Sequence, residues 1–121
     1  MMLQWSIMRE NLLNPLKKID SAAAAMLSET DLSVEQEQII SMVQTGTATL
    51  TELVVSMPDF TLERVREVMS FESRSHLASI IGYAEVLLEQ STSLSQRQQD
   101  LLHTIRACGK QVLSQLIQIE G

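Results

Sequence analysis

The sequence has few residues that turn a chain sharply, cross-link it or pack as aromatic rings. Its 121 residues include 4 Gly, 2 Pro and 1 Cys, and only 3% are aromatic. Scarce glycine and proline leave few sharp turns, and scarce aromatics argue against a β-sandwich, whose strands favour aromatic and β-branched side chains. One cysteine excludes an internal disulfide and a cysteine-based zinc site and is typical of the reducing cytosol. We therefore expect no metal and no other cofactor.

The sequence also lacks positive charge and long apolar runs. Its formal net charge is −6, so it does not have the basic surface that binds a nucleic-acid backbone. No apolar run approaches the roughly 20 residues of a membrane span. Charges at Arg9 and Glu10 precede any apolar run of signal-peptide length. We expect a soluble, cytoplasmic protein that binds neither nucleic acid nor membrane.

What the sequence does have is apolar residues at helical spacing, and 45% of its residues are hydrophobic. The pattern predicts helices over about 3–28, 33–57, 61–89 and 95–119. Residues 57–60 form the expected central connection. Helices with wide apolar faces and short loops predict an all-α protein, an antiparallel up-down-up-down four-helix bundle that forms a single domain over residues 1–121.

Local signals sharpen these helices. Ser33 with Gln36, and Ser95 with Gln98, have the spacing of a capping box at the start of the second and fourth helices. Pro15 lies inside the first helix, where it removes a backbone hydrogen bond and is expected to cause a kink. The residues expected to face inward are Met8, Leu12, Ile19, Ala23 and Met26; Ile39, Val43, Gly46, Leu50 and Leu53; Val65, Met69, His76, Ile80, Ala84 and Leu87; and Leu101, Leu102, Ile105, Cys108, Val112, Leu116 and Ile119.

The two halves of the sequence resemble each other. Leu16 and Leu77 are 61 positions apart, and beyond the first loop the offset becomes 62, where the pattern Leu-Ser-x-x-Gln recurs. This shared loop and cap favours an internal duplication over a chance alignment of amphipathic helices. We predict two repeated helical hairpins, 1–57 and 61–121, related by a pseudo-two-fold axis. They either close the bundle within a monomer or exchange to form a homodimer.

The second half carries a more specific pattern. Residues 69–89 read Met-Ser-Phe-Glu-Ser-Arg-Ser-His-Leu-Ala-Ser-Ile-Ile-Gly-Tyr-Ala-Glu-Val-Leu-Leu-Glu. Over residues 68–119 the chain resembles the dimerisation and phosphoacceptor hairpin of bacterial sensor histidine kinases, whose motif reads S-H-E-L-R-T-P-L-N-x-I-I-G-Y-x-E-L-L. The residues in register with that motif are Ser70, Glu72, Arg74, Leu77, Ile80, Ile81, Gly82, Tyr83, Glu85 and Leu88.

Two departures from this family remove its chemistry. The family's phosphorylated histidine falls on Phe71, and in the first half on Glu10, and neither side chain is a phosphoacceptor histidine. The sequence also lacks the family's ATP-binding domain and any glycine-rich loop that would hold a phosphate. We therefore do not expect autophosphorylation.

Four residues keep a chemical alternative open: His76 or His103 for phosphotransfer, and Glu72 with Ser75 for a phosphatase. His76 is either a half-buried structural residue or a relocated phosphoacceptor. Glu72 and Ser75 keep the i, i+3 spacing at which the family positions a water to dephosphorylate its partner, or they are ordinary solvent-facing residues. His103 is expected at the rim of the fourth helix, and two histidines on different helices do not make a metal site.

The resemblance implies a non-catalytic two-component-type signalling module, a degenerate kinase dimerisation domain that binds a response-regulator receiver domain or a histidine kinase. Two alternatives stay open: a histidine phosphotransfer protein or response-regulator phosphatase, and a truncated structural dimerisation fragment of a larger sensor kinase. The positions that inherit the family's docking surface are Phe71, Ser75, Ala78, Ser79, Gly82, Tyr83, Gln98 and Leu101.

Overall fold

Four α-helices account for most of the part of the chain that the structure describes. This computed structural model describes residues 2–29, 31–56 and 72–120, with all side chains except those of residues 2–5, 91 and 118–120. The elements are α1 (Met2–Leu27), α2 (Val34–Ser56), α4 (Arg74–Glu89), the short 3₁₀ turn η2 (Ser91–Ser93) and α5 (Gln96–Glu120). No strand occurs among these residues, so the predicted all-α class is confirmed.

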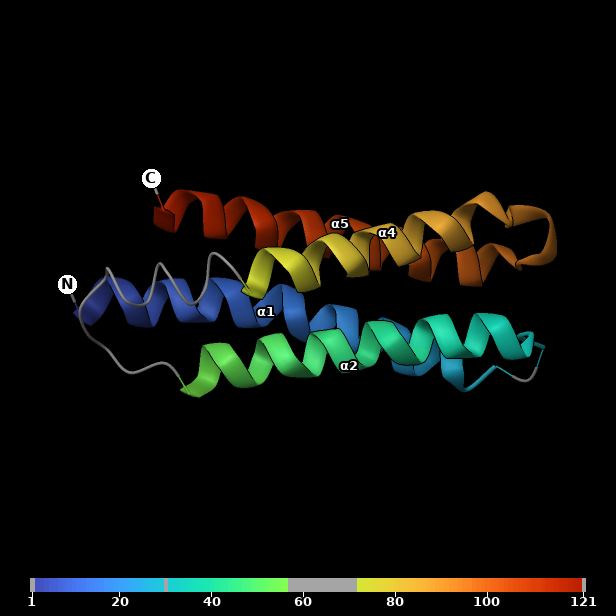
Figure 1. The fold of residues 1–121 in the computed structure, drawn as a ribbon, viewed down its shortest axis with the longest axis horizontal. Helices are drawn as coiled ribbons and strands as arrows, with labels where there is room; N and C mark the ends of the chain where they lie inside the picture. The colour runs from blue at the N-terminus through green and yellow to red at the C-terminus, as the bar shows by residue number, and fades with distance from the viewer. Residues whose placement is uncertain (1, 30, 57–71, 121) are drawn as a thin grey trace.

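The helices pack as a four-helix bundle, as the sequence predicts. α1 packs against α2 and α5, and α4 packs against the same two helices, so α1 and α4 lie diagonally across the bundle. In Figure 1, α1 starts at the end marked N, and α5 finishes beside it at the end marked C. The two short connections, 28–33 and 90–95, lie together at the opposite end of the bundle (Figure 1).

Both predicted capping boxes are present. The backbone N–H of Gln36 donates to Ser33 Oγ at 3.1 Å, and the N–H of Ser33 donates to Gln36 Oε1 at 2.9 Å. Ser95 and Gln98 make the same two bonds at 3.1 and 2.9 Å. Because these bonds satisfy backbone donors that a helix start otherwise leaves unpaired, they define where α2 and α5 begin.

One apolar core runs along the bundle, and burying each large side chain in it contributes about 1.5–3 kcal/mol. α1 continues through Pro15, which is buried. None of the helices, over the residues described, is both long and apolar enough to cross a membrane. The largest fully buried side chains are Leu12, Leu16, Ile19, Met26, Ile40, Leu50, Leu77, Ile80, Leu87, Leu102 and Ile105.

The inward face of α2 includes the predicted Val43 and Leu50, but elsewhere it is shifted toward the next residue along the helix. Ile40, Thr47 and Val54 are buried, whereas the predicted Ile39 and Leu53 are only half-buried. A heptad pattern favours bulky apolar residues, but Thr47 is buried because its hydroxyl donates to the Val43 carbonyl at 2.7 Å. Its polar atom is therefore satisfied inside the helix.

On α4 the fully buried residue of the first turn is Leu77, and His76 beside it is half-buried. The prediction that His76 belongs to the inner stripe is thus correct only in part. The predicted connection 57–60, the start of the third helix near Thr61, and the inward positions Val65 and Met69 lie outside the described residues.

The buried positions of the two hairpins follow the offsets seen in the sequence. Ile19 and Ile80, 61 positions apart, are both buried, and so are Ile40 and Leu102, 62 positions apart. Two hairpins that turn equivalent faces inward are compatible with an internal repeat. The duplication itself stays a prediction.

Candidate functional site

Five of the predicted docking residues lie together on α4. Ser75, Ala78 and Ser79 are exposed, and Tyr83 is half-buried with its side chain against the core. Gly82 faces open space, because a Cβ built on it would meet nothing within 4 Å among the described atoms. At about 100° per residue, positions 75, 79 and 82 fall in one line along the helix. We call these five residues the α4 stripe.

Two exposed apolar side chains border the α4 stripe, Met42 on α2 and Val86 one turn further along α4, and the sequence-based prediction missed them. A Cβ on Gly46 of α2 would lie 3.5 Å from Ile80 Cγ1 of α4. Because the two helices run in opposite directions (Figure 1), Met42, one turn before Gly46, lies level with the α4 turn that holds Tyr83. Met42 and Val86 are each 45% exposed. The i, i+4 spacing of Gly82 and Val86 was the sequence signal for this extension.

Two predicted docking residues do not belong to this surface. Gln98 is only 1% exposed, and its side-chain amide is engaged inside the protein, so it cannot contact a partner. Leu101 is half-buried in a groove between α5 and α1. The α4 stripe lies on α4, the other helix of the same hairpin as α5. The structure therefore does not place Gln98 and Leu101 on the α4 stripe.

The groove between α1 and α5, here called the lysine groove, has a volume of about 360 Å³. The repeat offset of 61 places its α1 residues at the positions of Ala78, Ser79, Gly82 and Tyr83 in the second half. α1 therefore carries a counterpart of the α4 stripe, but two of its members are cationic. Sequence reasoning overlooked this groove although the offset pointed to it. The lining residues are Lys17, Lys18, Ser21, Ala22, Leu101 and Thr104.

A second groove, of about 570 Å³, separates α1 from α2. Its wall includes Asp20 and Thr47, whose counterparts in the second hairpin are Ile81 and Gly109. There, a Cβ on Gly109 would lie only 2.9 Å from Ile81 Cγ1, so isoleucine fills the space above the glycine. The space between α4 and α5 is therefore filled at the place where a groove separates α1 from α2. The full lining is Leu16, Lys17, Asp20, Ser21, Thr47, Ala48, Thr51, Glu52 and Val55.

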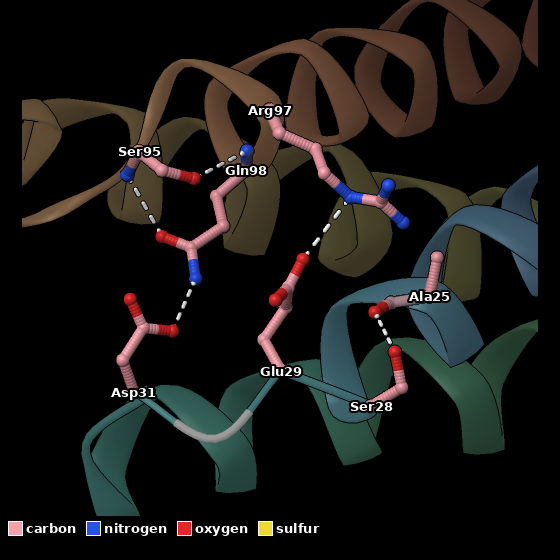
Figure 2. Close-up of polar contacts among 7 residues, drawn as sticks. All are labelled: Ala25, Ser28, Glu29, Asp31, Ser95, Arg97 and Gln98. Carbon is pink, nitrogen blue, oxygen red and sulfur yellow. Dashed lines mark hydrogen bonds and ion pairs between the residues drawn. The ribbon is translucent and has the colours of Figure 1, made fainter.

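The two capping glutamines also join the hairpins. Besides completing its cap, Gln98 donates from Nε2 to Asp31 Oδ1 at 2.9 Å, as Figure 2 shows. Gln36 Nε2 in turn donates to Ser93 Oγ at 3.3 Å and to Gln90 Oε1 at 3.4 Å. Asp31 and Ser93 are themselves 62 positions apart, so each glutamine reaches the equivalent residue of the opposite loop.

An ion pair reinforces this junction. Arg97 Nε lies 3.0 Å from Glu29 Oε1, and both residues are drawn in Figure 2. The Arg97 side chain is 65% exposed, so the pair contributes less than about 1 kcal/mol. We call the contacts between loops 28–33 and 90–95 the hairpin junction. It sets the register of the two hairpins at one end of the bundle.

The residues proposed for phosphoryl chemistry lie at the start of α4 and just before it, apart from His103, which is exposed on α5. Glu72 and Ser75 are exposed, and residues 72–73 form a π-helical turn before α4. His76 is half-buried, and Phe71, at the family's phosphoacceptor position, lies outside the described residues. Over residues 2–29, 31–56 and 72–120, no three His, Cys, Asp or Glu side chains converge as metal ligands.

Cys108 carries a further nucleophilic group, a thiol, and it is buried on α5. Burial raises the pKa of its thiol above the ordinary 9.0, because a thiolate loses hydration there, and the charge of Lys18 opposes the rise. A buried thiol held in its neutral form behaves as a small apolar core residue.

We compared the chain with known proteins in three ways. No family model, curated protein or solved structure matches it. Its helical fold and accessible surfaces therefore carry the functional argument.

Proposed function

We propose that this protein is a non-catalytic protein–protein interaction module of two-component type. It binds a response-regulator receiver domain or a histidine kinase through the α4 stripe, and a cytoplasmic location accompanies this role. The observation that carries the proposal is an accessible α4 stripe inside the segment that resembles the kinase hairpin, with phenylalanine where that family has its phosphoacceptor histidine.

The shape of the stripe supports docking. Small side chains at Ser75, Ala78 and Ser79, with the bare backbone at Gly82, let a partner approach the helix closely. Tyr83 at one edge offers a rigid aromatic ring, and rings of this kind often carry much of an interface's energy. Met42 and Val86 extend the exposed apolar area beside the α4 stripe. These features suit a protein surface better than a small-molecule site.

The direct test is a pull-down of the host's receiver domains and kinases with the intact chain and three variants. Gly82→Leu places bulk in open space and should abolish capture without unfolding the helix, since nothing stands within 4 Å. Tyr83→Ala should also abolish it. The control, Ala107→Leu, creates the same side chain at an exposed site on α5 and should leave capture unchanged. Capture that survives both α4 variants would refute docking at this stripe.

The same reagents separate binding from catalysis. A phosphorylated receiver domain is incubated with the protein, and both phosphoproteins are followed over time. Acid-labile label on this chain would indicate phosphotransfer through His76 or His103. Faster loss of phosphate from the receiver would indicate a phosphatase that uses Glu72 and Ser75. Binding with neither effect is the expected result.

A further inference from the structure

We propose that the lysine groove between α1 and α5 is a docking site for an acidic amphipathic helix of a protein partner. This site is separate from the α4 stripe, and the proposal does not depend on a two-component role. It rests on the charge of the groove rim, the apolar character of its floor and the position of the groove between two packed helices.

The rim charge is exceptional for this chain. Residues 1–60 carry three basic side chains against eight acidic ones, and two of the three are Lys17 and Lys18. Both lysines are exposed, and neither forms an ion pair with any described residue. Asp100, the nearest acidic residue on the α5 wall, accepts a hydrogen bond from Gln96 Nε2 at 2.9 Å. Two cations without an ion pair among the described residues therefore border the groove, and Lys17 also lines the neighbouring groove that holds Asp20 and Glu52.

The floor of the groove is apolar. Ala22 is 4% exposed, and half-buried Leu101 faces it from α5. The Thr104 hydroxyl donates to the Asp100 carbonyl of its own helix at 3.1 Å, so it does not require a partner. The aliphatic stems of Lys17 and Lys18 add apolar wall beneath their charged ends. An apolar side chain of the occupant fits this floor.

These features together select the occupant. A groove between two packed helices accepts a third helix whose apolar residues recur at three- and four-residue spacing. Carboxylates beside that apolar face would pair with Lys17 and Lys18. An occupant with a basic face would meet both lysines as like charges, and the electrostatic cost would exclude it.

The test selects binders from a phage-displayed library of helical peptides with randomised faces, using the intact protein as bait. We expect the selected peptides to be net negative, with leucine or isoleucine on one face. Lys17→Glu combined with Lys18→Glu should weaken their binding at least about tenfold, and Leu101→Ala should weaken it as well. The control, Lys110→Glu, reverses an exposed charge about half a turn around α5 from Leu101 and should leave binding within about twofold.

Several results would overturn the proposal. Selected peptides that are neutral or basic would do so, and so would acidic peptides that bind the double lysine variant as well as the native chain. A selection that yields no binder to the native chain also refutes it. Gly82→Leu should leave peptide binding unchanged, so this experiment and the α4 pull-down can fail independently.

Discussion

The hairpins α1–α2 and α4–α5 have similar residues at equivalent buried positions but different residues at equivalent outer positions. Their buried faces match, as with Ile40 and Leu102, which are both fully buried. Their outer faces do not. The first hairpin places Lys17 and Lys18 where the second has Ala78 and Ser79. One frame thus supports a pair of lysines on α1 of the first hairpin and an uncharged stripe of small residues on α4 of the second.

The same contrast holds between the helices of each hairpin. Asp20 and Thr47 leave a groove between α1 and α2, and Ile81 on Gly109 closes the equivalent place between α4 and α5. Core positions tolerate little change because packing is dense, whereas outer positions are free to differ. The comparison teaches that function should be sought where the hairpins diverge. It also supplies matched pairs of substitutions.

The largest expected effect tests whether the cores are equivalent. Ile40→Ala and Leu102→Ala should each lower the free energy of unfolding by about 2–5 kcal/mol, because each leaves a cavity in the shared core. Urea denaturation followed by circular dichroism measures both. Val34→Ala, at a residue that is 72% exposed, is the control and should change stability by less than about 0.5 kcal/mol. If either core variant behaved like the control, the hairpins would not contribute equally.

The second prediction compares the same substitution at the two equivalent glutamines of the hairpin junction, Gln98 and Gln36. Gln98→Glu keeps the oxygen that caps α5 but turns a carboxylate toward Asp31, and we expect a loss of about 2–3 kcal/mol. Gln36→Glu keeps the cap of α2 and faces Ser93. The Ser93 hydroxyl donates to the Gln90 carbonyl at 3.0 Å and can turn to the new carboxylate instead, so the loss should stay below about 1 kcal/mol. Equal losses in urea denaturation would show that Asp31 does not matter to the junction.

The third prediction places one side chain at equivalent positions of the two hairpins. Gly109→Val places a branched Cβ against Ile81. We expect the overpacking to lower the free energy of unfolding by about 1–3 kcal/mol. Thr47→Val keeps the shape of a side chain that already bonds its own helix, so its effect should be below about 1 kcal/mol. Thermal unfolding of both variants gives the comparison. A Gly109→Val protein as stable as native would mean that the second hairpin is not tightly closed.

The smallest effect concerns Cys108, whose counterpart in the first hairpin is Gly46. Burial raises the pKa of the Cys108 thiol in the folded state, so the folded protein disfavours the thiolate. This contribution to stability is fully present below pH 9 and is lost as the pH rises through the folded pKa. The stability difference between the native chain and Cys108→Ala should therefore shrink in alkaline solution. Urea denaturation at several pH values from neutral to alkaline would measure it, and a constant difference would contradict the prediction.

Local features of the fold could be predicted from the sequence, because their causes are local. Helical periodicity defines α1 and α5, and the serine and glutamine of each capping box lie three residues apart. The buried face of α2 was misjudged because the burial of Thr47 depends on a hydroxyl bond within the helix and on the approach of neighbouring helices. A pattern of bulky residues does not contain that information.

The candidate site was harder to predict for a similar reason. Exposure along α4 follows from helix periodicity, so the α4 stripe was found. Leu101 and Gln98 were misplaced because their surroundings depend on which helices pack across the two hairpins. α5 packs against α1, which puts Leu101 beside Lys17 and leaves Gln98 against the opposite loop. Sequence periodicity describes faces of single helices and does not say which helices meet.

The hairpin junction has a consequence for the order of folding. Gln98 Oε1 bonds Ser95, three residues away, while Gln98 Nε2 bonds Asp31, 67 residues away. Closing a short loop costs little chain entropy and is fast, whereas a distant contact waits until the hairpins have come together. The Oε1 bond of Gln98 is therefore expected to form early in folding, and its Nε2 bond late. In kinetic experiments, removal of the Asp31 carboxylate should mainly speed unfolding. Removal of the Ser95 hydroxyl, which accepts from the Gln98 backbone N–H in the same local cap, should mainly slow folding.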